Sequence, residues 1–243
     1  MENSHLEELI RIFKYAALGD NHILDFTFLD NSVRLYLPYA HTDLIQKTIL
    51  THRTFFENYL LLSIIKHIEP GSVIADIGAN IGNHTVFFGL CCKAEKVYAF
   101  EPLKTAFQVM SKNIQINGLN NIEPHNCAVG IEGETLSLDR CTPTNLGGSQ
   151  FTTSKNGEYP VRSLDSFELD RLDFIKLDVE GLQSPVLKGA QNTLSSLRPK
   201  ILVEVLDGEE DIFDGFANLE YKVVQKFGKT DYLLEAPKGK KWT

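Results

Sequence analysis

The sequence has few cysteines and no long apolar run. Its four cysteines, Cys91, Cys92, Cys127 and Cys141, lack the spacing of zinc ligands, and we expect reduced thiols. No stretch approaches the roughly 18 apolar residues that a transmembrane helix needs, and the N-terminus lacks the basic and apolar regions of a signal peptide. We therefore expect no membrane partner and a cytoplasmic location.

Positive charge is also scarce. The 243 residues include 24 lysines and arginines against 32 aspartates and glutamates, which gives a formal net charge of −8 at pH 7. Proteins that bind nucleic acid by neutralising its phosphates need the opposite balance, so we expect no nucleic-acid partner. Internal repeats are absent as well, and 43% hydrophobic residues can fill one sizeable core. We expect a single catalytic domain.

A glycine-spaced turn follows a short apolar run at residues 72–77, whose β-branched side chains are typical of a buried parallel strand. Gly78 and Gly82 can take positive φ and let a ligand approach the backbone, and a helix is expected to begin near Asn83. The spacing G-x-x-x-G differs from the dinucleotide fingerprint G-x-G-x-x-G, which disfavours a nicotinamide or flavin dinucleotide. The turn predicts a nucleotide-type pocket.

A second acid supports the same pocket. Residues 96–101 are predicted to form the next strand and end in Glu101, 25 residues after Asp76. A carboxylate at that place can accept hydrogen bonds from both hydroxyls of a ribose.

The first 70 residues are predicted to form a cap that is part of the same domain. Its expected elements are a helix over 4–18, a hairpin of strands 22–29 and 32–37 with a two-residue turn at Asp30-Asn31, and a helix over 52–68.

Strand and helix alternate over residues 71–243, which predicts an α/β fold with a mostly parallel sheet, right-handed crossovers and helices on both faces. The expected strands are 72–77, 96–101, 122–127, 172–178, 199–205, 219–226 and 230–235. The last two strands form a closing hairpin around Gly228, so the last strand runs antiparallel. Residues 133–160 are an insertion, either rich in β structure or a mobile loop over the pocket.

Several blocks together resemble one family. They are Phe55-Phe-Glu57, residues 76–85 (DIGANIGNHT), Phe100-Glu-Pro102, residues 126–130 (NCAVG), residues 175–181 (IKLDVEG) and residues 186–190 (VLKGA). In order and spacing they are similar to the FkbM family of class I S-adenosylmethionine-dependent methyltransferases, whose members are mostly O-methyltransferases of sugars and polyketide-like natural products. Residues 182–185 (LQSP) depart from the acidic or aromatic run that is commoner in the family, which leaves the acceptor open.

The resemblance implies a Rossmann-like fold with a seven-stranded sheet and S-adenosylmethionine as cofactor. The residues that it assigns to the cofactor are Glu57, Asp76, Gly78, Ala79, Asn80, Gly82, Asn83, Glu101, Pro102, Asn126, Cys127, Ala128 and Asp178. Asp76 would contact the cofactor's ammonium directly or through water, and Glu101 would hold the ribose. Asn126 would contact the adenine or else bond its own turn.

Candidate catalytic residues lie at the ends of later strands. Asp178 and Glu180 could accept a proton, orient a substrate hydroxyl or bind a divalent ion such as magnesium, although a loop carboxylate can also cap the next helix. Glu204 could complete that metal site or pair with Lys176 in the neighbouring strand. His84, in the first turn of the helix after the glycine loop, is a further candidate base, or else a surface or capping histidine.

We expect the chain to methylate a hydroxyl of a sugar, a glycan or a related small molecule. N-methylation or carboxyl methylation is one alternative, although Asp178-Val-Glu-Gly181 differs from the Asn/Asp-Pro-Pro-aromatic signature of many amino-group methyltransferases. A scaffold that binds the cofactor without turnover is the other. The sequence predicts no particular oligomeric state.

Overall fold

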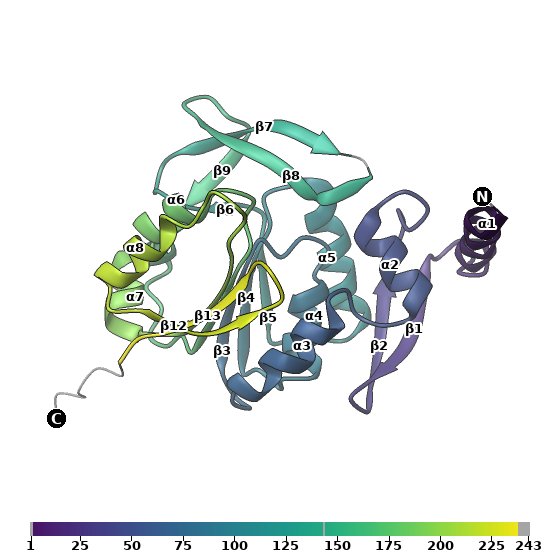
Figure 1. Cartoon of the computed structure of the whole chain (residues 1–243), viewed down its shortest axis with the longest axis horizontal. Helices are drawn as coiled ribbons and strands as arrows, with labels where there is room; N and C mark the ends of the chain where they lie inside the picture. The colour runs from purple at the N-terminus through teal and green to yellow at the C-terminus, as the bar shows by residue number, and fades with distance from the viewer. Residues whose placement is uncertain (1, 143, 238–243) are drawn as a thin grey trace.

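A mostly parallel seven-stranded sheet organises the chain. The computed structural model describes residues 2–142 and 144–237. The strands lie in the order β12-β13-β11-β10-β3-β4-β5, and β13 runs antiparallel to both of its neighbours (Figure 1). They are β3 (Val73–Ile77), β4 (Lys96–Phe100), β5 (Ile122–His125), β10 (Phe174–Leu177), β11 (Lys200–Glu204), β12 (Lys222–Phe227) and β13 (Asp231–Glu235). The predicted seven-stranded, mostly parallel sheet with its antiparallel last strand is confirmed.

Helices cover both faces of this sheet (Figure 1). On one face lie α6 (Gln183–Lys188), α7 (Gln191–Leu197) and α8 (Ile212–Asn218), and on the other α3 (Asn58–Ile64), α4 (Asn83–Leu90) and α5 (Lys104–Ile116). Successive strand residues alternate between the two faces. Val73, Ala75 and Ile77 therefore pack in one hydrophobic cluster, and Ile74 packs in the other. This alternation places Asp76 on the face of α4.

The N-terminal part of the chain packs against α4 and α5, and its helix α3 lies on the same face of the sheet as they do. It comprises α1 (Glu2–Ala16), β1 (Ile23–Phe28), β2 (Asn31–Tyr36), α2 (Leu44–His52), α3 and the short helix η1 (Ile65–His67). Its buried side chains share one hydrophobic cluster with those of α4 and α5. The division of the chain at residue 70 stays a prediction.

The predicted hairpin turn is shifted by one residue. Phe28 pairs with Asn31, so the turn residues are Leu29 and Asp30, both with positive φ. Asn31 instead begins β2, and its side-chain amide donates to the carbonyl of Leu29. Two residues with positive φ give the backbone twist that a two-residue hairpin requires.

The predicted helix over 52–68 is wrong in its first third. The chain is helical over 44–52 and again from Asn58, with Arg53 and Glu57 in the left-handed region between them. The break is a tertiary effect, because the side-chain amide of Asn83 bonds both the N–H and the carbonyl of Phe56 at 2.9 and 3.1 Å. These contacts replace the helical hydrogen bonds of the segment.

The insertion adopts the β-rich alternative. A second sheet in the order β6-β9-β7-β8 consists of β6 (Ala128–Val129), β7 (Thr135–Thr142), β8 (Asn145–Ser154) and β9 (Tyr159–Arg162), and the short helix η2 (Leu164–Phe167) follows it. The long hairpin of β7 and β8 lies across one end of the main sheet (Figure 1). Within the described ranges, no helix has the length and apolarity needed to cross a bilayer.

Candidate active site

A cavity of about 240 Å³ lies at the carboxyl ends of the parallel strands. Its floor includes the residues that follow β3, β4 and β10 and the last residue of β11, and β8 contributes the opposite wall. The sheet order reverses between β3 and β10, and ligands of open α/β sheets bind at such a point. The residues predicted from sequence that line the cavity are Glu57, Gly78, Ala79, Asn80, Asn83, His84, Glu101, Pro102, Ala128, Asp178, Glu180 and Glu204.

The loop after β3 needs glycine at its first position. Gly78 has φ +81°, and a Cβ there would lie 1.8 Å from the carbonyl oxygen of Asp178. Two residues on, Asn80 adopts φ +49°, and its side-chain oxygen is buried without a hydrogen-bond partner among the described residues. A buried polar atom without a partner is costly unless a ligand or water completes it.

Glu101 is fastened at the edge of the cavity. One carboxylate oxygen accepts the N–H of Asn80 at 2.8 Å, and the other accepts the N–H of Leu103 at 2.7 Å. Burial raises the pKa of Glu101 to about 7, although these two hydrogen bonds oppose the shift. Each oxygen retains a lone pair, so the carboxylate can still accept hydrogen bonds from two vicinal hydroxyls.

Asp76 lies beneath the cavity and does not line it. Its side chain is fully buried, accepts a hydrogen bond from Thr85 at 2.6 Å and lies 3.6 Å from the ammonium of Lys176. Contact of Asp76 with the cofactor's ammonium, directly or through water, stays a prediction. Asp76 holds Lys176, its partner in the β3–β10 register.

Lys176 connects the glycine loop after β3 with the carboxylate that follows β10. Its ammonium donates to the carbonyl of Gly78 at 2.7 Å and lies 3.1 Å from the carboxylate of Asp178. Burial opposes its charge, but Asp178 and Asp76 outweigh burial and raise the pKa of Lys176. The predicted pairing of Lys176 with Glu204 is wrong, because Asp76 and Asp178 take that place.

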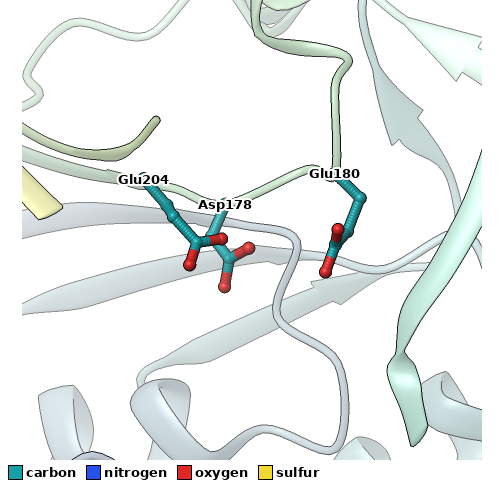
Figure 2. Close-up of side chains that lie close together, drawn as sticks. All are labelled: Asp178, Glu180 and Glu204. Carbon is teal, nitrogen blue, oxygen red and sulfur yellow. The ribbon is translucent and has the colours of Figure 1, made fainter. Parts of the chain in front are cut away.

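Three carboxylates form the far end of the cavity. Figure 2 shows Asp178 and Glu204 side by side, with Glu180 pointing the same way from the next turn of the loop. Each offers an oxygen within 4.8 Å of the others. Burial raises the pKa of Asp178, but the ammonium of Lys176 and a hydrogen bond with Glu204 outweigh it, so the net pKa is lowered. Burial and the charge of Asp178 raise the pKa of Glu204 to about 9.

These shifts identify where the proton of the pair lies at neutral pH. Glu204 is protonated and donates to the ionised Asp178, in the manner of two carboxyl groups that share one proton. Burial and the same charge raise the pKa of Glu180 as well.

Glu57 and His84 form a second polar pair beside the first. The imidazole Nε2 lies 3.7 Å from a carboxylate oxygen of Glu57. Burial, followed by the charge of Lys176, lowers the pKa of His84 to about 3, whereas burial and Asp178 raise the pKa of Glu57 to about 7. His84 is therefore neutral at physiological pH, and any proton in this pair resides on Glu57.

Three further residues assigned to the cofactor by the resemblance do not line the cavity. Gly82 instead packs against Met110, and a Cβ there would lie 2.9 Å from that side chain. Asn126 donates to the carbonyls of Glu101 and Pro102 at 2.9 Å each, so it supports the neighbouring loop rather than its own turn. Cys127 is buried in the hydrophobic cluster on the face of α6 to α8.

The wall opposite the sheet comes from the insertion that was predicted as either β-rich or a loop over the pocket, and from α2, for which the sequence carries no such prediction. Leu44 and Ile45 of α2 line it together with residues 146–149 and Phe151 of β8. Asp231, the register partner of Glu204, lies in a small adjoining pocket with Glu57 and His84. These residues carry no local signal of function, since the cavity depends on how distant segments pack.

Comparison with known proteins shows that the chain matches a known family. The family described as "Methyltransferase FkbM domain" matches residues 76–233. "Methyltransferase 1" of Beauveria bassiana is 24% identical over 177 residues, which cover 62% of this chain and 71% of the relative. "Hexuronic acid methyltransferase AglP" of Haloferax volcanii is 25% identical over 158 residues and 63% of each chain.

Solved structures agree on the fold. The methyltransferase FkbM of Methylobacillus flagellatus KT superposes with a TM-score of 0.50 at 19% identity, over 94% of this chain and 59% of its own. Sp1610 of Streptococcus pneumoniae, a putative tRNA (m1A22) methyltransferase, gives 0.52 at 15% identity, over 76% and 72%. The chain thus spans less than two thirds of the archaeal relative and of the Methylobacillus protein.

Proposed function

The chain belongs to the FkbM methyltransferase family, and from that premise we propose that it transfers a methyl group from S-adenosylmethionine to a hydroxyl of a sugar, a glycan or a related small molecule. One observation carries the proposal. A loop built for close ligand approach and a ribose-type carboxylate lie in the same cavity as an ionised carboxylate, Asp178, that can receive the hydroxyl proton.

The residues of the cavity fit the cofactor. Close approach to the backbone at Gly78, the unpartnered oxygen of Asn80 and the free lone pairs of Glu101 match an amino acid and a ribose. Ala128 and Pro102 supply apolar surface for an adenine. When bound, the cofactor supplies a methyl group on a positively charged sulfur.

Asp178 is the proposed base. Methyl transfer forms a bond from the acceptor oxygen to the methyl carbon, breaks the bond from that carbon to sulfur, and releases the hydroxyl proton. Asp178 can accept this proton because Lys176 keeps it ionised and Glu204 orients it. Glu180, in the same cluster, would hold the acceptor, and its proximity to Asp178 supports this role. His84 is a weaker candidate than expected, since burial lowers its pKa to about 3.

The first test separates cofactor binding from turnover. Calorimetry with S-adenosylmethionine and S-adenosylhomocysteine measures binding, and mass spectrometry of sugar acceptors measures transfer. Asp178→Asn is expected to bind the cofactor within a few-fold of the wild type and to lose about 10²–10⁴-fold in kcat. Unchanged turnover in this variant would refute Asp178 as the base.

The same assays distinguish two alternative functions. Transfer to an amine or a carboxylate acceptor instead of a hydroxyl would keep the enzyme and change the substrate. Cofactor binding without transfer to any acceptor would favour the scaffold. An RNA acceptor is disfavoured by the net charge of −8 and by the carboxylates that line the cavity.

A magnesium ion is a second candidate for the cluster of Asp178, Glu180 and Glu204. Three carboxylate oxygens within 4.8 Å of one another are hard ligands of the kind magnesium prefers. Turnover in EDTA compared with turnover in added magnesium tests this role. Loss of activity in EDTA, restored by magnesium, would assign the cluster to the metal.

A further inference from the structure

The charged side chains that line the cavity are almost all acidic. Among the described lining residues the carboxylates are Glu57, Glu101, Asp178, Glu180 and Glu204, and Lys176 is the one lysine or arginine. Glu101 belongs to the proposed ribose end. The other four acidic side chains therefore surround the place where methyl donor and acceptor would meet, with Asp178 ionised and the proton that it shares with Glu204 on the Glu204 side.

The ammonium of Lys176 is not available to an acceptor. Its three neighbours are the carbonyl of Gly78 at 2.7 Å, Asp178 at 3.1 Å and Asp76 at 3.6 Å. The carbonyl accepts a hydrogen bond from the ammonium, and the two carboxylates form ion pairs with it. The side chain lines the cavity but is only 6% exposed, so little of its charge is accessible to an acceptor. His84 adds no positive charge, because its imidazole is buried and neutral.

Two of the acidic residues are held in place by the backbone. Glu57 and Glu180 have φ of +56° and +48°, a region that residues other than glycine rarely adopt. They come from different parts of the chain, since Glu57 precedes α3 and Glu180 follows β10. Both line the cavity with Asp178. Strained positions of this kind cluster where a ligand is gripped.

We propose that this acid-lined end selects acceptors without a negative charge, namely neutral polyhydroxyl compounds and, among charged ones, those with a protonated amine, and that it rejects acceptors with a carboxylate or phosphate beside the reacting hydroxyl. The inference rests on the proposed function and deepens it. The acceptor that it predicts differs in charge from the hexuronic acid in the name of the archaeal relative. The reason is that an anion in this cavity would lose its hydration and face carboxylates with no free cation to pair with.

A probe without an acceptor tests the charge directly. Sinefungin carries an amine where the methyl group of the cofactor sits, whereas S-adenosylhomocysteine is uncharged at the same place. In EDTA, calorimetry should show sinefungin bound about tenfold or more tightly. Glu180→Gln should reduce this ratio severalfold. The control Glu95→Gln, at an exposed ion pair with Arg171 ahead of β4, should leave it unchanged.

Matched acceptors test selectivity. Sets of three compounds that differ in one substituent, hydroxyl, amine or carboxylate, are compared for methyl transfer by the full chain. The carboxylate member should be at least about tenfold poorer in kcat/KM than the other two, and Glu180→Gln should narrow that gap.

Several outcomes would overturn the inference. They are equal affinity for sinefungin and S-adenosylhomocysteine, preference for the carboxylate member, transfer to that member only with magnesium, and no transfer to any set while the cofactor binds. Failure to bind the cofactor at all would instead refute the proposed function, so the two failures are distinguishable.

Discussion

At the scale of single residues, the cavity is marked by backbone conformations as much as by side chains. Asn80 shares the left-handed region with Glu57 and Glu180, and all three line the same space. Gly78 adds a fourth positive φ, at a site where no side chain fits. The three non-glycine conformations cost stability, and a ligand that uses their exposed groups gives a physical reason for them.

Gly78→Ala should destabilise the protein and abolish cofactor binding. The new Cβ would meet the carbonyl of Asp178 at 1.8 Å on a backbone with φ +81°, and we expect a loss of about 2–4 kcal/mol in the free energy of unfolding. Urea denaturation measures this loss. Gly71→Ala is the matched control, since φ is +80° but nothing lies within 4 Å. Equal losses in both variants would show that the close approach to Asp178 is unimportant.

Glu101→Gln should weaken binding of S-adenosylmethionine about tenfold or more, because a charged acceptor is replaced by a neutral one. With its pKa near 7, wild-type Glu101 is partly protonated in the free protein, so affinity should rise as pH increases through 7. The variant should lose this part of the pH dependence. Glu57 has a similar pKa, so Glu57→Gln serves as the comparison. This variant should keep the rise in affinity that ionisation of Glu101 causes near pH 7. A pH dependence unaltered by Glu101→Gln would contradict the assignment.

At the scale of elements, hydrogen bonds tie the wall opposite the sheet, which β8 contributes to the cavity, to the start of α2. Asp43, which is buried, accepts the N–H of Gln46 at 3.0 Å with one oxygen and the N–H of Leu146 at 2.8 Å with the other. The N–H of Leu44 donates to the carbonyl of Thr144 at 2.8 Å. One carboxylate thus caps a helix and holds the wall formed by β8.

Asp43→Asn should loosen this wall. The amide group would turn a donor toward one of two N–H groups and leave it without an acceptor, at a cost of about 1–3 kcal/mol. Hydrogen exchange should become faster over residues 144–149 while β3 and β10 stay protected, and the acceptor KM should rise more than kcat falls. Thr48→Ala, on the exposed side of α2, is the control. Unchanged exchange over 144–149 would show that the tie does not hold this wall.

At the scale of the whole molecule, several carboxyl groups with a raised pKa lie together in and beside the cavity. Burial raises the pKa of Asp231 to about 6, of Glu57 and Glu101 to about 7, and, with the charge of Asp178, of Glu204 to about 9. A carboxyl group whose pKa is higher in the folded than in the unfolded state stabilises the fold when protonated. That contribution is complete below about pH 4 and is lost as pH rises through each folded value.

The protein without ligand should therefore lose thermal stability as pH rises from about 5 to 9. Each kcal/mol lost lowers Tm by about 2–4 °C for a chain of this size. Differential scanning calorimetry at constant ionic strength measures the slope. Glu204→Gln should flatten the segment between pH 7 and 9, since it removes the group with the highest raised pKa. A Tm that climbs steadily across this range would contradict these shifts.

Much of the fold could be predicted because its signals are local. Short runs rich in apolar residues mark most of the seven strands, and glycine at 78 permits the turn that follows the first of them. Adjacent residues determine these features through sterics and periodicity. The same locality explains why the acids at strand ends were expected to meet, since the carboxyl ends of parallel strands share one edge of the sheet.

The sequence by itself therefore determined the sheet, the glycine loop and the family. Only the tertiary structure decided how helix 52–68 is broken, which acids hold Lys176 and how the insertion is tied to α2 over the cavity. The break depends on Asn83, 27 residues from Phe56, and the tie on Asp43, 103 residues from Leu146. Hydrogen bonds over such separations form only when the packed core brings their partners together, so no local pattern encodes them.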